Sequence, residues 1–138
     1  MTMNRARFSL LSIFVVFLSV QLVAFSAVSQ KVWPEEYQTL MLKVLAIYSV
    51  HLTVILGAIF AQARTHLKNP PAELAWTAIL LALLWNLALT WRSISFSLAS
   101  QDSVRDLIKY LDSMSSASSF LVTGALAFFF TKGSQPAK

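Results

Sequence analysis

Apolar residues gather in four blocks along the chain, and short polar stretches separate the blocks. The blocks cover about residues 8–29, 37–62, 72–96 and 111–131. Helices of about 20–26 residues are roughly 30–39 Å long, enough to cross a hydrocarbon core of about 30 Å. The alternation of apolar and polar residues that marks membrane strands is missing. The pattern therefore predicts an all-α fold: an integral membrane four-helix bundle, with residues 1–138 as a single domain and neighbouring helices antiparallel.

The polar stretch before the last block carries a helical pattern of its own. Its apolar positions recur at helical spacing, at Val104, Leu107, Ile108 and Leu111. Ser103 and Asp106 are spaced as in a capping box. Residues 102–112 are therefore predicted to form a short amphipathic segment, which either lies at the membrane interface or extends the last helix.

The first block allows two interpretations. A basic start, an apolar middle and the small residues Ala27 and Ser29 are typical of a cleaved signal peptide. The apolar stretch of about 22 residues is longer than the roughly 7–15 residues of a signal core. We therefore expect an uncleaved first membrane helix.

Composition and charge agree with a membrane protein. The chain is 57% hydrophobic and 12% charged, whereas a soluble domain has about 25% charged residues. Its net charge of +5 comes from single basic residues at block ends rather than from a cluster, so nucleic acid is not an expected partner. Lys and Arg are more frequent on the side that holds both termini, which predicts cytoplasmic termini and a location in the cell (plasma or inner) membrane. The absence of cysteine excludes disulfides.

Small residues recur every three, four or seven positions in all four blocks. They are Ser12, Ser19 and Ser26 in the first block, Ala46, Ser49, Thr53, Gly57 and Ala61 in the second, Ala75, Ala78, Ala82, Asn86, Thr90, Ser93 and Ser97 in the third, and Ser116, Ser119, Thr123, Ala127 and Thr131 in the fourth. In lipid, small residues let helix backbones approach closely. The predicted helix-packing positions are Ser49, Thr53, Gly57, Ala61, Ala82, Asn86, Ser119 and Thr123.

Polar side chains at membrane depth are the candidate functional residues. His51 lies near the middle of the second block, about 200° around the helix from Ser49, which predicts a contact surface for another subunit or a partner. It is either a hydrogen-bonded structural imidazole or a group that responds to protons or contacts a ligand. Lys43 either extends toward the headgroups or pairs with Glu36 or an acidic lipid. Asn86 either bonds a neighbouring helix or contacts a ligand.

The start of the last block is rich in serine. Ser115, Ser116 and Ser119 belong to a run with five serines in seven residues. This run either lies among the headgroups or lines a wet outer vestibule.

Catalytic signals are missing from the sequence. We find no metal-ligand cluster, no nucleophile motif and no glycine-rich phosphate loop, and one histidine at mid-depth cannot supply two axial ligands to a haem. The sequence thus predicts a protein that is not an enzyme and has no cofactor or metal. Three hypotheses follow: a subunit that oligomerises or docks on a larger membrane complex, a homo-oligomeric pore with a serine-lined vestibule, or a small carrier or lipid or quinone-site protein that uses His51. The expected partners are the lipid bilayer and either copies of the chain or other membrane subunits.

Overall fold

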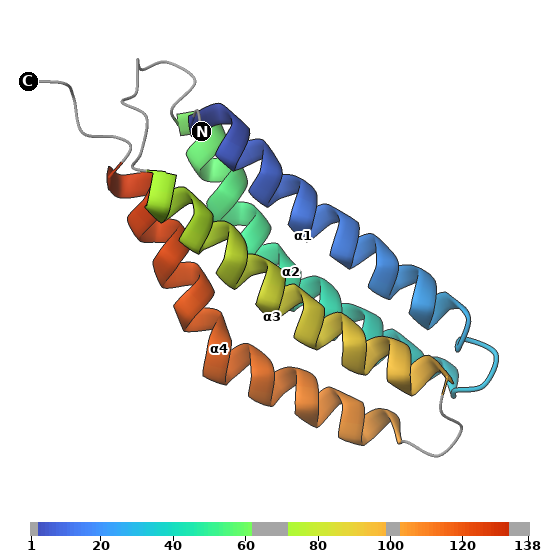
Figure 1. Ribbon diagram of the computed structural model, residues 1–138. Coiled ribbons are helices and arrows are strands. Elements are labelled where there is room, and N and C mark those ends of the chain that lie inside the picture. Colours follow the sequence, from blue (N-terminus) through green and yellow to red (C-terminus); the bar gives the residue numbers. More distant parts are fainter. Residues whose placement is uncertain (1–2, 62–71, 99–102, 133–138) are drawn as a thin grey trace, which may run out of the picture.

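A computed structural model describes the backbone of residues 3–61, 72–98 and 103–132. Side chains are described in the same ranges except at residues 3–4, 61, 118–121 and 128–132. The described chain forms four α-helices and contains no strand. They are α1 (Met3–Ser26), α2 (Pro34–Ala61), α3 (Ala72–Leu98) and α4 (Val104–Lys132), and they lie alongside one another (Figure 1). The predicted all-α fold is confirmed.

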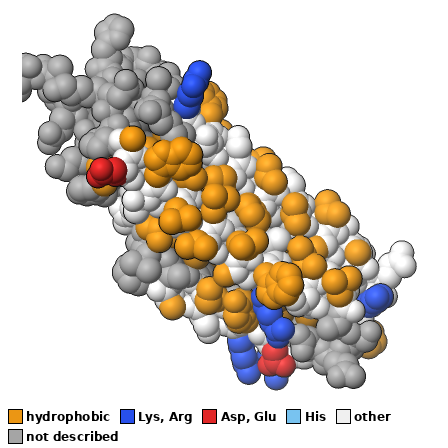
Figure 2. Space-filling view, viewed as in Figure 1, with side chains coloured by type: hydrophobic (Ala, Val, Ile, Leu, Met, Phe, Trp, Pro, Cys, Tyr) orange, Lys and Arg blue, Asp and Glu red, His pale blue; other side chains and the backbone are white. Residues whose placement is uncertain are grey.

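Three of these helices are long and apolar enough to cross a membrane. The spans are Arg5–Ser26, Pro34–Phe60 and Ala72–Leu98, with mean hydropathies of 2.4, 1.9 and 1.7. Large hydrophobic side chains stay exposed along them, including Val23, Phe60 and Trp76. Figure 2 shows hydrophobic side chains spread over the middle of one face, with charged groups toward its two ends. These features indicate a membrane protein, because lipid is the solvent that suits such a surface.

The helix boundaries follow local signals. Pro34 occupies the first helical position of α2, where its missing N–H costs nothing, and the Trp33 carbonyl accepts the first helical bond from Tyr37 N–H at 2.9 Å. Ser103 caps α4: its Oγ accepts from the backbone N–H of Asp106 at 3.2 Å and donates to the Asp106 carboxylate at 2.7 Å. The predicted cap is confirmed.

The amphipathic segment is the first part of α4 rather than a separate element. One helix runs without interruption from Val104 to Lys132. Val104, Leu107 and Leu111 are buried against the bundle, so this apolar face packs on protein instead of lying on the membrane interface. The helix thus begins about seven residues before the predicted position of 111.

The helices form a ring in the order α1, α2, α4, α3. α1 and α4 each contact α2 and α3, whereas the described parts of α2 and α3 lie diagonally, as do those of α1 and α4. Figure 1 shows that α1 and α3 run in one direction and α2 and α4 in the other. Two of the four packed pairs, α1 with α3 and α2 with α4, are therefore parallel, whereas consecutive helices run in opposite directions. We call the end where α1 stops and α2 begins the turn end, and the opposite end the terminal end.

The small-residue stripes behave differently in the different helices. The α3 stripe is buried, and its six buried members are Ala75, Ala78, Ala82, Asn86, Thr90 and Ser93. In α1 the stripe is exposed, and Ser19 and Ser26 donate to carbonyls of their own helix. The buried face of α1 instead carries Leu10, Phe14 and Phe25. Small residues thus line the contact where α3 meets its two neighbours, while α1 packs through bulky side chains.

Substitution of Ala82 tests this packing. Ala82 is completely buried, so Ala82→Leu should overpack the α3 contact and lower the free energy of unfolding by about 1–3 kcal/mol. Ala127→Leu makes the same chemical change at an exposed position of α4 and should leave stability within about 0.5 kcal/mol. Reversible unfolding in mixed detergent micelles measures both. Equal effects of the two substitutions would contradict the assignment of the buried face.

Candidate functional site

A cavity between α2 and α4 brings together three of the predicted functional residues. Its volume is about 240 Å³, and its lining is Lys43, Ala46, Ile47, Val50 and His51 from α2 with Asp112 and Ser115 from α4. The sequence predicts Lys43 and His51 as a charged and a polar side chain at membrane depth, and it predicts Ser115 as part of the serine-rich run. We call this space the α2–α4 cavity.

An ion pair crosses the turn end of the cavity. Lys43 Nζ contacts Asp112 Oδ1, and the two side chains are 37% and 47% exposed. A pair this exposed contributes little stability, about 0–1 kcal/mol. Lys43 therefore pairs with an acidic residue, but the partner is Asp112 on α4 rather than the predicted Glu36.

A second hollow of about 340 Å³ lies nearer the turn end between the same helices. Its lining carries Glu35 and Glu36 on α2, with Arg105 and Lys109 on α4. Charges of both signs thus surround the approach to the α2–α4 cavity.

His51 points into its own bundle and is only 1% exposed. Its Nδ1 lies 3.1 Å from the Ile47 carbonyl oxygen, and its Nε2 lies 3.4 Å from Thr123 Oγ1 on α4. Because a carbonyl only accepts, Nδ1 carries the hydrogen in the neutral ring, and Nε2 accepts from the Thr123 hydroxyl.

The prediction that His51 faces a partner is wrong, because α2 is rotated the other way. The inward face of α2 is its bulky one, with Leu40, Val44, Ile47, Tyr48 and Ile55 buried beside His51. These side chains fill the space between diagonal helices, which small residues could not reach.

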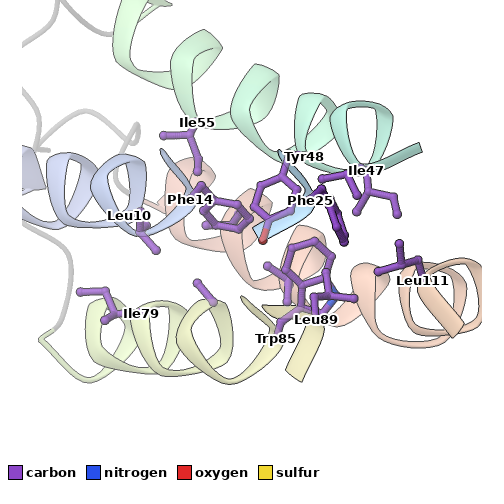
Figure 3. Close-up of a cluster of buried hydrophobic side chains, with 14 of the residues drawn as sticks. Leu10, Phe14, Phe25, Ile47, Tyr48, Ile55, Ile79, Trp85, Leu89 and Leu111 are labelled. Carbon is purple, nitrogen blue, oxygen red and sulfur yellow. The ribbon is translucent and has the colours of Figure 1, made fainter. Parts of the chain in front are cut away.

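Aromatic rings pack around His51 in the middle of the bundle. Its ring stacks on Phe14 at 5.2 Å between centroids with an interplanar angle of 17°, and lies 4.5 Å from the Trp85 ring. Phe14, Tyr48 and Trp85 also contact one another, and Figure 3 shows them meeting between α1, α2 and α3. Side chains of α2 and α3 thus contact one another across the centre of the bundle, although these two helices are not packed neighbours.

Gln21 links three helices through hydrogen bonds. Its Nε2 donates to Tyr48 Oη on α2 at 2.8 Å and to Thr90 Oγ1 on α3 at 3.1 Å. Ser93 Oγ lies 3.4 Å from Gln21 Oε1 and 2.9 Å from the Leu89 carbonyl, so one hydroxyl hydrogen faces two acceptors. Gln21 was not among the residues predicted from the sequence, although a lone amide inside an apolar block is as informative as His51.

The small-residue stripe of α2 faces outward. Ala46, Ser49, Thr53 and Gly57 are exposed, and a Cβ placed on Gly57 would have no neighbouring atom within 4 Å. Ser49 donates to the Ala46 carbonyl of its own helix. These predicted packing residues are therefore not buried within the bundle, and the side chain of Ala61 lies outside the described residues.

The remaining predicted residues do not join the α2–α4 cavity. Asn86 is fully buried on α3 and donates to the Ala82 carbonyl of its own helix, while its Oδ1 has no hydrogen-bond partner among the described residues. Ser116 is exposed on α4, and the Ser119 side chain lies outside the described residues. Of the two predicted vestibule residues whose side chains are described, Ser115 lines the cavity and Ser116 does not.

No family model, curated protein or solved structure matched this chain. Within the described residues, no group of three His, Cys, Asp or Glu side chains is placed to hold a metal ion. Function is therefore inferred from the geometry of the α2–α4 cavity and of the outward face of α2.

Gln21→Leu tests the hydrogen-bonded link between helices. The substitution leaves Tyr48 and Thr90 without their shared donor, so we expect the free energy of unfolding to fall by about 1–3 kcal/mol. Ser19→Ala removes a hydrogen bond within exposed α1 surface and should change stability by less than about 0.5 kcal/mol. Unfolding in mixed micelles compares the two, and a Gln21→Leu protein as stable as the parent would show that the link carries no stability.

A double-mutant cycle tests the ion pair at the cavity. With Lys43→Met, Asp112→Asn and the double variant, the coupling energy should lie below about 1 kcal/mol because both groups are partly exposed. Stability is measured in the same micelles. A coupling of several kcal/mol would instead identify the pair as a principal link between α2 and α4.

Proposed function

We propose that this chain is a non-enzymatic membrane subunit that assembles, with copies of itself or with a larger membrane complex, through the outward face of α2. In this proposal all four helices span the plasma or inner membrane, and both termini are cytoplasmic. One observation carries the proposal: the stripe of Ser49, Thr53 and Gly57 lies on the outside of the bundle, where the described residues do not cover it.

The shape of this face supports helix association. Small residues recur at every fourth position of this face, and the bulky side chains of Leu45, Val50 and Phe60 are also exposed on α2. In lipid, such small residues let two helix backbones approach closely and gain van der Waals contact. Association of this kind needs no charged or catalytic group.

The pore hypothesis gains no support from the single bundle. Phe14, Tyr48, His51 and Trp85 fill its centre, so an ion path along the bundle axis would be blocked. A conduit would have to lie between copies.

Gly57→Leu tests the assembly face. A leucine there meets open space in the single chain, so we expect the helices to fold normally while the backbones of two associating helices can no longer approach. Copies and partners are counted by native mass spectrometry after gentle extraction from the membrane, and helical content is checked by circular dichroism. We expect at least a tenfold loss of association, which corresponds to about 1.4 kcal/mol.

Gly124→Leu is the matched control. Gly124 is also exposed on its helix, α4, and a Cβ placed on it would likewise have no neighbouring atom within 4 Å, so the substitution is chemically identical. It should retain the assembly of the parent chain. Unchanged assembly of Gly57→Leu, or equal loss in both variants, would contradict the assignment of the α2 face. A second protein at fixed stoichiometry would identify a subunit of a larger complex, and copies alone would identify a homo-oligomer.

A further inference from the structure

The α2–α4 cavity joins a charged entrance to a buried imidazole. Lys43 and Asp112 lie at its turn end, and His51 lines it two helical turns further in. Ser115 adds a hydroxyl from the facing helix. An ionisable group at this depth in a membrane helix is a functional candidate by default.

We propose that His51 is a proton-binding site that water reaches through the α2–α4 cavity from the turn end alone. The ligand is a proton delivered by water, and the acceptor is the Nε2 lone pair of the neutral ring. This site is independent of the assembly face, because the His51 ring points inward while Ser49, Thr53 and Gly57 point outward.

The cavity has room for water and carries polar side chains. Its volume of about 240 Å³ exceeds, several times over, the roughly 30 Å³ that one water molecule occupies in the liquid. Lys43, Asp112 and Ser115 provide hydrogen-bonding partners along it. A wholly apolar cavity would stay dry, whereas these polar side chains give water hydrogen-bond partners.

The opposite side of His51 is packed with apolar side chains. Toward the terminal end, Ile55 on α2, Leu10 on α1 and Leu126 on α4 are fully buried. These side chains offer water no hydrogen-bond partner. Among the described side chains next to His51, hydrogen-bond partners for water therefore lie toward the turn end, and Arg7 on α1 lies beyond the apolar layer.

The surroundings of His51 can accept a charged ring. After protonation, Nε2–H becomes a donor, and the Thr123 hydroxyl rotates to accept from it. The face of Phe14 is stacked on the ring, the Trp85 ring lies 4.5 Å away at an angle of 44°, and aromatic rings at such distances attract a cation.

Titratable groups on the helices around His51 set the electrostatic background. They are Lys43 and Tyr48 on α2, Asp112 on α4 and Arg7 on the buried face of α1, whereas the buried face of α3 contributes none. Lys43 and Asp112 are oppositely charged partners, so the entrance carries no net charge.

Trp85 provides a direct optical test. An excited indole loses its emission to a protonated imidazole in contact, and the two rings are 4.5 Å apart. Trp33, Trp76 and Trp91 are exposed, so replacing all three with Phe leaves Trp85 as the single tryptophan, which is excited selectively over tyrosine, without disturbing the core. In proteoliposomes of neutral phospholipid, acidification from about pH 8 to 5 should quench Trp85 reversibly.

Substitution of each histidine identifies the group that titrates. His51→Gln should abolish the quenching, whereas His66→Gln should retain it. Nitrogen-15 NMR of the His66→Gln chain provides a second measurement, because His51 is then the only histidine and is itself unchanged. The Nε2 signal of His51 should shift over the same pH range. Quenching that survives His51→Gln, or an Nε2 signal that does not change between about pH 8 and 5, would overturn the proposal.

A sided pH jump tests the route. The chain has no cysteine, so Ser29→Cys near the turn end can be labelled with a membrane-impermeant maleimide to determine orientation in the vesicles. Acid added on the turn-end side should quench Trp85 promptly, while acid added on the other side should act only as the gradient decays. Equal rates from both sides would overturn one-sided access. Gly57→Leu should titrate as the parent does, so failure of this proposal is distinguishable from failure of the assembly proposal.

Discussion

The position of three helices depends on one buried amide, that of Gln21. In lipid no water is present to satisfy a polar group, so the amide needs partners from neighbouring helices. Tyr48 and Thr90 accept from it, which fixes the rotation and the height of α2 and α3 relative to α1. With Tyr48 turned inward, His51 follows on the same face of α2 less than one turn later. The bond made by Gln21 thus determines which side of α2 meets the bundle and which side meets its surroundings.

The ring order of the helices explains both the aromatic centre and the cavity. α2 and α3 lie diagonally, and only long side chains can bridge the gap between them, as Tyr48, His51 and Trp85 do. Around the ring, Ala46 and Ser115 are short side chains on the facing sides of α2 and α4. Their size leaves unfilled volume between these parallel helices, whereas a bulky pair would close it. The polar character of the lining follows from Lys43, Asp112 and His51.

Much of the fold could be predicted from the sequence, because the length of each apolar block and the capping signals are local properties. Ser103 with Asp106 marks the start of α4 from their spacing alone. The rotation of each helix could not be predicted in this way. A stripe of small residues suits either a packed contact, as in α3, or a surface that the chain leaves open, as in α2, and its spacing is the same in both cases. Gln21 would have resolved the rotation of α1, since a buried amide specifies an inward face more strictly than serines that bond their own helix.

In the candidate site, too, some residues can be predicted from their position in one helix, whereas others depend on which helices are neighbours. His51 and Lys43 were found because charge or polarity at membrane depth is costly wherever the helix faces. The sequence predicts Asp112 only as the last residue of the polar segment 102–112. Its pairing with Lys43 could not be predicted, because it requires α2 and α4 to be adjacent and parallel. Ala46 acquires significance in the same way, since it lines the α2–α4 cavity and also begins the outward stripe of α2. Its two roles depend on the rotation of α2 and on the adjacency of α4, and spacing along one helix specifies neither.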